Sequence, residues 1–119
     1  MNIGIFGSNN DSTIDGVVAE AAQAEKDGFA SYWQSQIFGL DALSTLSVVG
    51  REVPRIELGT SVIPVYPRHP MMLAQQALTA NQAAGGRLTL GIGLGHKVVV
   101  EGMTGMSFDK PVRHMKDYL

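Results

Sequence analysis

Two hydrophobic periods alternate along the whole chain, and this alternation limits the possible fold more than any other feature. Short β-rich runs start near residues 2, 29, 56 and 88, and each precedes a stretch whose apolar residues recur every three or four positions. The strand starts lie about 27, 27 and 32 residues apart, which is the length of one strand–loop–helix unit. Such alternation predicts a parallel sheet covered by helices, with right-handed crossovers between successive strands.

The expected strands are 2–6, 29–35, 56–63 and 88–92, and the expected helices are about 13–27, 41–53, 70–84 and 109–119. Ser12 or Thr13 is suited to cap the first helix, and Asp41 the second. Gly28 stands where a left-handed residue would end the first helix. Pro70 suits the first position of the third helix, where its missing N–H is not needed.

This periodicity leaves two architectures open, a doubly wound open sheet and a β/α barrel. Residues 1–119 are expected to form one α/β domain with about four parallel β/α units. A closed β/α barrel needs eight strands, so the chain would be the N-terminal half of one. Both sheet edges would then be unpaired, and two copies could associate to supply eight strands.

Charge and composition narrow the classes of partner. The net charge is −2 and the nine Lys and Arg residues are scattered, so no basic field would attract nucleic acid or an anionic membrane. The absence of cysteine excludes disulfides and a cysteine nucleophile, and no His, Asp and Glu cluster has metal-ligand spacing. No signal-peptide pattern opens the chain and no apolar run approaches the roughly 20 residues that span a bilayer. We expect a soluble, cytoplasmic protein.

In either architecture, functional residues gather at the carboxyl ends of the strands. The segment 59–70 joins the third strand to a helix through three prolines, and is either a rigid loop or a platform beneath a flat ligand. Small Ser61 and β-branched Val62 leave room for a ring against the backbone. Gly91, Gly93 and Gly95 follow the fourth strand, but they depart from the G-x-G-x-x-G dinucleotide pattern and no clear helix pattern stands directly behind them. These glycines fit close approach to a ligand, or tight packing.

Two polar side chains, those of His96 and Gln36, are candidates for a role near that edge. His96 follows a strand beside glycines and is the best acid–base candidate, the alternative being a plain loop histidine. Gln36 follows the second strand and could bind a ligand or cap the loop. His69 precedes a proline at a helix start and suits capping, and His114 in the last helix is expected to be exposed.

Several motifs occur in one characteristic order. They are Gly28-Phe29 before Ser31-Tyr32-Trp33, the run IELGTSV at 56–62, Arg68-His69-Pro70, and the run GGRLTLGIG at 85–93. This series resembles the N-terminal half of the luciferase-like monooxygenase superfamily, and most of all its branch that uses the deazaflavin coenzyme F420. The resemblance covers essentially the whole chain.

The resemblance implies a TIM-type β/α barrel and hydride transfer between a small-molecule substrate and C5 of coenzyme F420, with FMN-dependent oxygen chemistry as the alternative. It places the cofactor ring at the barrel mouth, with the candidate contacts Ser61, Val62, Ile63, Pro64, Gly93 and Gly95. It also implies a cis peptide bond at Ser61–Val62, and a phosphate tail held largely by later strands of the barrel.

The chain departs from the family at one position of the expected site. Many relatives carry an acid followed by histidine after the second strand, where this chain has Gln36-Ile37. That departure leaves His96, with Gln36 as a polar contact, as the candidate catalytic residues. A homo-oligomer is expected, either as an enzyme or as a non-catalytic half-barrel that self-associates.

Overall fold

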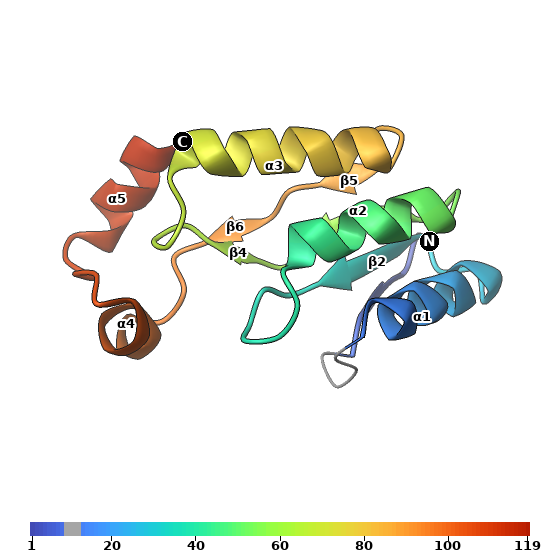
Figure 1. Cartoon of the computed structure of the whole chain (residues 1–119), viewed down its shortest axis with the longest axis horizontal. Helices are drawn as coiled ribbons and strands as arrows, with labels where there is room; N and C mark the ends of the chain where they lie inside the picture. Colours follow the sequence, from blue (N-terminus) through green and yellow to red (C-terminus); the bar gives the residue numbers. More distant parts are fainter. Residues whose placement is uncertain (9–12) are drawn as a thin grey trace.

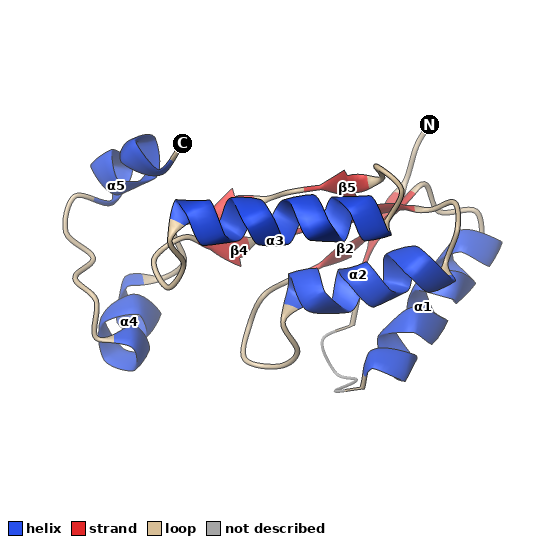
Figure 2. Ribbon diagram, turned by 45° about the horizontal axis from the view of Figure 1, so that its top comes forward, coloured by secondary structure: helices blue, strands red, loops and turns tan. Residues whose placement is uncertain are grey.

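In the computed structural model, which describes residues 1–8 and 13–119, three helices lie on one face of a parallel sheet (Figures 1 and 2). The strands are β1 (Gly4–Phe6), β2 (Ser31–Gln34), β3 (Glu57–Thr60), β4 (Ile63–Pro64), β5 (Leu88–Thr89) and β6 (Ile92–Gly93). The long helices are α1 (Ile14–Lys26), α2 (Ala42–Glu52) and α3 (Pro70–Ala83), and the C-terminal segment holds α4 (Lys97–Val99), the π-helix η1 (Val100–Thr104) and α5 (Pro111–Tyr118).

Every pair of neighbouring strands is parallel. The main sheet has the order β1-β2-β3-β5, and β4 pairs with β6 in a second, two-stranded sheet. Strands and helices alternate as predicted, so the expectation of about four parallel β/α units is confirmed. The third predicted strand is parallel to its neighbours, with Leu58 opposite Tyr32 on one side and Leu88 on the other.

Two of the predicted strands are each broken into two. The third is interrupted between β3 and β4, where the Ser61–Val62 peptide bond is cis as the resemblance implies. The fourth is interrupted between β5 and β6 at Leu90 and Gly91. Because the two interruptions lie opposite each other, β3 pairs with β5 below them and β4 pairs with β6 above them.

The main core lies between the sheet and the helices. Tyr32 and Leu58 point into it from neighbouring strands, and Leu46 and Val49 cover them from α2. Apolar burial of this kind stabilises a fold by about 25 cal/mol per Å² of area removed from water. A second cluster joins Leu43, Leu73 and Ala80 between α2 and α3; α2 and α3 are therefore held to the sheet and to each other.

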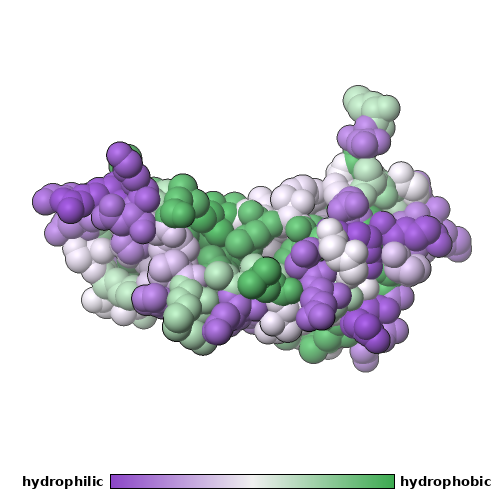
Figure 3. All heavy atoms as spheres, turned by 90° about the horizontal axis from the view of Figure 1, so that it is seen from above, coloured by the Kyte–Doolittle hydropathy of each residue, from purple (hydrophilic) through white to green (hydrophobic). Residues whose placement is uncertain are grey.

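The opposite face of the sheet is open. Phe6 is 53% exposed there, and Trp33 lies flat against the Cα of Gly59, where a side chain would collide with the indole. Seen from above, the molecule is hollowed along one edge, and hydrophobic side chains gather beside the hollow between two hydrophilic ends (Figure 3). A sheet with apolar groups on both faces is typical of a barrel strand, which is buried on both sides.

The helix ends follow local rules. Thr13 accepts a hydrogen bond from the Gly16 N–H, Asp41 from the Ser44 N–H, and Nδ1 of His69 from the Met71 N–H. The caps predicted at Thr13, Asp41 and His69 are confirmed, whereas Ser12 lies outside the described residues. Gly28 has φ +86°, the left-handed conformation expected at the end of α1.

The C-terminal segment corrects two predictions. Residues 97–104 form α4 and η1 directly behind the glycine string, where no clear helix was expected. His114 is not exposed, because it stacks on Tyr66 with ring centres 4.1 Å apart. Phe108 stacks on the same tyrosine at 5.1 Å, so an aromatic cluster ties α5 to the loop after β4. No helix in the described part of the chain is long and apolar enough to cross a membrane.

Candidate functional site

The carboxyl ends of the strands converge on one edge, as predicted. Hydrogen bonds that continue past the ladders tie neighbouring tips together. The bonds run from Gly7 N to Trp33 O (2.8 Å), from Ser61 N to Gln34 O (2.9 Å), from Ile63 N to Gly91 O (2.9 Å) and from Val65 N to Gly93 O (2.9 Å). The edge is therefore a continuous main-chain surface rather than four separate loops.

Thr60 holds this surface together where the two strands break. Its hydroxyl, on a residue that is only 1% exposed, accepts from the Gly91 N–H and donates to the Gly91 carbonyl, both at 2.9 Å. The hydroxyl thereby satisfies the Gly91 N–H, and it gives the Gly91 carbonyl a second donor beside the Ile63 N–H. Gly91 is required there, because a Cβ would collide with the Thr60 carbonyl oxygen.

Val62 lies over Gly93 at the same edge. A Cβ on Gly93 would come within 2.5 Å of Cγ2 of Val62, so the Val62 side chain fits there because Gly93 has no side chain. Val62 is 39% exposed and Ser61 is also exposed, which leaves both accessible from solvent. These residues form a largely apolar surface, here called the Val62 shelf, which consists of Ser61, Val62 and Gly93.

Two further predicted contacts lie beside the Val62 shelf, and one faces away from it. Gly95 has φ +75°, and a Cβ on it would lie 3.9 Å from Cβ of Pro64, so the glycine loop and the proline segment come together. Ile63 differs, because its side chain is fully buried between α2 and α3 and its N–H is bonded to Gly91. A ligand on the open side could not reach the Ile63 side chain.

His96 follows Gly95 and is the N-cap residue of α4. Its side chain is exposed and makes no capping hydrogen bond, while its carbonyl accepts from the Val99 and Val100 N–H groups. The main chain therefore fixes the position of His96, and the imidazole is free to meet a ligand. Its role as an acid or base stays a prediction.

Gln36 does not join that group. Its Oε1 accepts a hydrogen bond of 2.8 Å from the Ala42 N–H at the start of α2, so the side chain anchors the loop between β2 and α2. Of the two roles considered for Gln36, the structure shows the cap on the loop. The amide nitrogen is the part of the side chain that the capping bond does not use.

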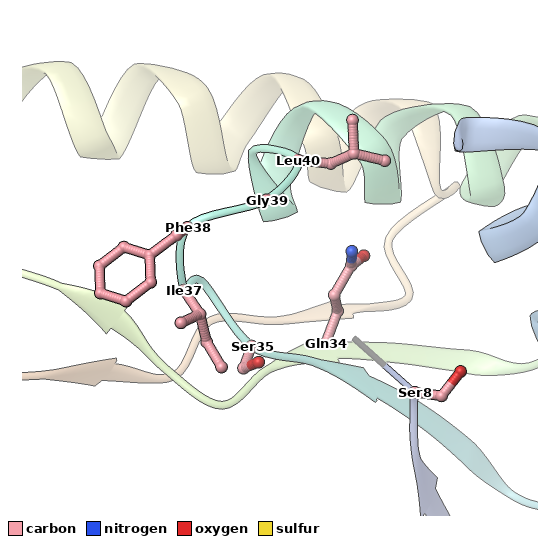
Figure 4. A pocket seen from close by; sticks show the side chains of 7 residues that line it. All are labelled: Ser8, Gln34, Ser35, Ile37, Phe38, Gly39 and Leu40. Carbon is pink, nitrogen blue, oxygen red and sulfur yellow. The ribbon is translucent and has the colours of Figure 1, made fainter. Parts of the chain in front are cut away.

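A pocket of about 210 Å³ lies where that loop leaves β2 (Figure 4). It is lined by Ser8, Gln34, Ser35 and the segment 37–40. Oε1 of Gln34 and Oγ of Ser35 are buried there and have no hydrogen-bond partner among the described residues. Buried acceptors of this kind are usually satisfied, so the pocket offers two polar positions for a ligand.

A buried tyrosine fixes the end of β1 beside this pocket. The Tyr32 hydroxyl donates to Oε2 of Glu20 at 2.7 Å, and Oε1 of Glu20 accepts from the Ser8 N–H at 2.9 Å. Burial, with the hydrogen bond to Glu20 and the charge of that carboxylate, raises the pKa of Tyr32 well above its ordinary value. The tyrosine is therefore a neutral donor at physiological pH, and its role is to position the strand end.

Sequence reasoning missed Thr60, and it placed Gln34 and Ser35 in a candidate segment at a strand end (34–40) without assigning either of them a role. Thr60 stands in a quoted motif, but its partner is 31 residues away and only the strand register brings them together. Gln34 and Ser35 precede the predicted Gln36 on the same strand end. Their polarity next to a buried strand was the available signal. Within residues 1–8 and 13–119, no three His, Asp or Glu side chains are grouped to hold a metal ion.

Comparison with known proteins identifies the family. The family model described as luciferase-like monooxygenase matches residues 1–119. The chain belongs to the luciferase-like monooxygenase family. It is also 39% identical, over 98 residues, to a protein of Mycobacterium tuberculosis named as a proposed coenzyme F420-dependent oxidoreductase. That match covers 82% of this chain and 28% of the relative, so the chain spans less than a third of the relative's length.

Solved structures of luciferase-like proteins have the same fold. The coenzyme F420-dependent tetrahydromethanopterin reductase of Methanopyrus kandleri matches with a TM-score of 0.79 and 26% identity, covering 90% of this chain and 30% of that one. The oxygenating constituent of 3,6-diketocamphane monooxygenase of Pseudomonas putida, in complex with FMN, matches with a TM-score of 0.84 and 19% identity, covering 99% and 37%. The second likeness concerns the fold alone. The fold is α/β, with parallel strands and helices that correspond to part of a TIM barrel.

Proposed function

We propose that the chain is the cofactor-facing part of a coenzyme F420-dependent oxidoreductase that transfers a hydride to or from a small-molecule substrate. The Val62 shelf at the strand tips carries this proposal. It offers exposed apolar surface and main chain without a charged side chain, which suits the face of a planar ring. The identity to the F420-named relative from M. tuberculosis favours the deazaflavin over FMN.

Different residues of this chain would support the cofactor ring and transfer the proton at the barrel mouth. Ser61, Val62 and Pro64 would support the ring from one side, with Gly93 and Gly95 leaving the space that a side chain would fill. A bound deazaflavin supplies a carbon that accepts or donates the hydride. His96 would take or return the proton that accompanies hydride transfer, since its imidazole is exposed and lies next to Gly95.

The test is a titration of this chain with F420 and, separately, with FMN, followed by NMR of the main-chain amides. We expect F420 to shift the amides of Ser61, Val62, Gly93 and Gly95, and to do so at lower concentration than FMN. NMR detects millimolar affinity, so weak binding by these residues alone would still be visible. Stronger shifts with FMN would favour the monooxygenase alternative, and no shift at these amides with either cofactor would contradict the proposal.

A matched pair of variants tests the Val62 shelf itself. Gly93→Val would fill the place occupied by Val62 and should abolish the F420-induced shifts. Gly102→Val is the control, because nothing lies within 4 Å of the position where its Cβ would stand. Equal binding by the two variants would show that the ring does not lie on the shelf.

A further inference from the structure

The pocket at the carboxyl end of β2 contains two buried polar atoms that the fold leaves without a partner (Figure 4). Gln34 is 7% exposed and Ser35 is 9% exposed, yet Oε1 of Gln34 and Oγ of Ser35 make no hydrogen bond in the described part of the chain. Unpaired buried polar groups lower the stability of a protein, so each of them calls for an explanation. Both atoms belong to residues that line the same pocket, which indicates that they serve a bound molecule.

Gln34 also stands where the fold favours an apolar side chain. Alternate residues of a strand face the same side of a sheet, so Gln34 shares a face with Tyr32, which is 1% exposed in the main core. A leucine at position 34 would keep the volume of the side chain and would leave no buried acceptor unpaired. A residue that lowers stability without serving the fold is typical of a functional position.

The charges around the pocket favour an uncharged ligand. None of its described lining residues is charged; they are Ser8, Gln34, Ser35 and residues 37–40. The carboxylate of Glu20 accepts from the Ser8 N–H, so a negative charge adjoins the lining. Arg68 is paired with the carboxylate of Asp41, the residue that follows the loop, and its positive charge is thereby compensated. An anionic ligand would meet no cation among the described lining residues and would lie near Glu20.

The size and the apolar part of the lining limit the ligand further. Ile37, Phe38 and Leu40 contribute apolar surface, and Figure 4 shows the Gln34 amide directed from the strand toward the loop that carries Leu40. An apolar cavity of about 150 Å³ holds a benzene molecule. The pocket, at about 210 Å³, therefore has room for one ring or a short chain with one or two polar substituents.

The pocket adjoins the Val62 shelf, because the Gln34 carbonyl accepts from the Ser61 N–H at 2.9 Å. We infer that the pocket holds the substrate of the proposed hydride transfer, and that this substrate is an uncharged, largely apolar molecule whose hydroxyl or amide N–H donates to Oε1 of Gln34. Oγ of Ser35 would bind a second polar group, since a hydroxyl both donates and accepts. The substrate role rests on the proposed function, whereas the preference for an uncharged donor does not.

NMR of the main-chain amides with three small aromatic probes tests this preference on the chain without a cofactor. Benzyl alcohol is uncharged and carries a donor, benzoate is an anion, and toluene has no polar group. We expect benzyl alcohol to shift the amides of Ser35, Ile37 and Gly39, with a dissociation constant roughly five-fold or more below those of benzoate and toluene. Benzoate binding as tightly as benzyl alcohol, or no shift at these amides with benzyl alcohol, would overturn the inference.

The variant Gln34→Leu removes the acceptor and keeps the apolar volume. It should weaken the binding of benzyl alcohol roughly five-fold or more and leave the binding of toluene unchanged, which also shows that the pocket is intact. Gln82→Leu, at an exposed position of α3 outside the lining, is the matched control and should bind all three probes as the unmodified chain does. Because Gln34→Leu leaves no buried acceptor unpaired, its urea midpoint should be no lower than that of the unmodified chain. A lower midpoint with unchanged binding of benzyl alcohol would show that the amide serves the fold alone, contrary to the inference.

Adding F420 separates the substrate role from the proposed function. Benzyl alcohol should keep its shifts at Ser35 and Ile37 while F420 shifts the amides of Val62 and Gly93. Displacement of benzyl alcohol by F420 would place the pocket within the cofactor site, so the substrate role would fail while the proposed function stands. If F420 failed to bind and benzyl alcohol bound as expected, the proposed function would fail and the preference of the pocket for an uncharged donor would remain.

Discussion

At the scale of single residues, Thr60 shows how one buried hydroxyl supports the candidate site. It pairs with both main-chain groups of Gly91, and no solvent can replace it because the residue is 1% exposed. Thr60→Val keeps the shape but removes both hydrogen bonds. It leaves the Gly91 N–H unpaired, while the Gly91 carbonyl keeps the Ile63 N–H as its donor. We expect a loss of about 1–3 kcal/mol in the free energy of unfolding, measured by urea denaturation.

The same position has a natural control. Thr60→Ser retains the hydroxyl and loses only a methyl group, so it should keep the bonds to Gly91 and cost about 1 kcal/mol or less. If the serine variant were as unstable as the valine variant, the methyl group and not the hydroxyl would hold the two broken strands together.

Glu25 makes stability depend on pH. Burial acts to raise the pKa of this carboxyl, but the N–H groups of Ile56 and Arg55 and the Arg55 guanidinium outweigh it and hold the pKa below 4.5. A folded-state pKa below the unfolded value means that the stabilisation is complete above pH 4.5 and is lost as the pH falls through the folded-state pKa. Glu25→Gln should therefore destabilise the chain by about 1–3 kcal/mol at pH 7.

The gap between Glu25→Gln and the unmodified chain should close in strong acid, because both then carry an uncharged side chain. Urea denaturation at pH 7 and at about pH 3 measures this closure. Glu52→Gln, at an exposed position of α2, should change the free energy of unfolding by less than about 0.5 kcal/mol at either pH. A gap that stays constant with pH would show that the charge of Glu25 contributes nothing.

At the scale of elements, the packing of α2 on the end of α3 depends on Gly50. A Cβ there would stand 2.7 Å from both Cα and Cβ of Ala84, and the main chain cannot move aside as a flexible side chain can. The Gly50 carbonyl also accepts from the Arg87 guanidinium at 2.8 Å. Helix propensity favours alanine over glycine by about 1 kcal/mol, but overpacking costs about 1–3 kcal/mol.

We therefore expect Gly50→Ala to lower the thermal midpoint, although the substitution improves the intrinsic helix propensity. Gly102→Ala, in η1 with open space around it, should leave the midpoint unchanged or raise it slightly. Scanning calorimetry on both variants compares the gain in helix propensity with the cost of overpacking. A raised midpoint for Gly50→Ala would mean that α2 and α3 can separate without cost.

The elements themselves were largely predictable because their signals are local. The caps at Thr13, Asp41 and His69 and the left-handed Gly28 depend on neighbours within four residues, which the sequence displays directly. The breaks in the third and fourth strands were not predictable from pattern. They depend on Thr60 bonding to Gly91, a contact across 31 residues that only the strand register creates.

The same difference between local signals and long-range contacts decides which parts of the candidate site were predictable. Strand ends and glycines at the barrel mouth could be located from alternation and spacing, and the resemblance supplied the cis bond at Ser61–Val62. The direction in which each side chain points could not be predicted, because successive residues along a strand face opposite sides of the sheet. Ile63 thus points into the core although its neighbour Val62 is exposed, and His114 is half-buried because it stacks on the distant Tyr66.

At the scale of the whole molecule, the sheet has one face covered by helices and one face open, and the two faces should respond differently to substitution. Leu58 is 1% exposed beneath the helices, whereas Phe6 is 53% exposed on the open side. Leu58→Ala should cost about 2–5 kcal/mol in the free energy of unfolding, because it leaves a cavity. Phe6→Ser should cost less than about 1 kcal/mol, since the ring already remains half in water.

Urea denaturation of the two variants at one low protein concentration measures this asymmetry. If both substitutions cost the same, the open face must be covered in solution, by a second copy or by another part of the chain, and the cost of Phe6→Ser would then grow with protein concentration only in the first case.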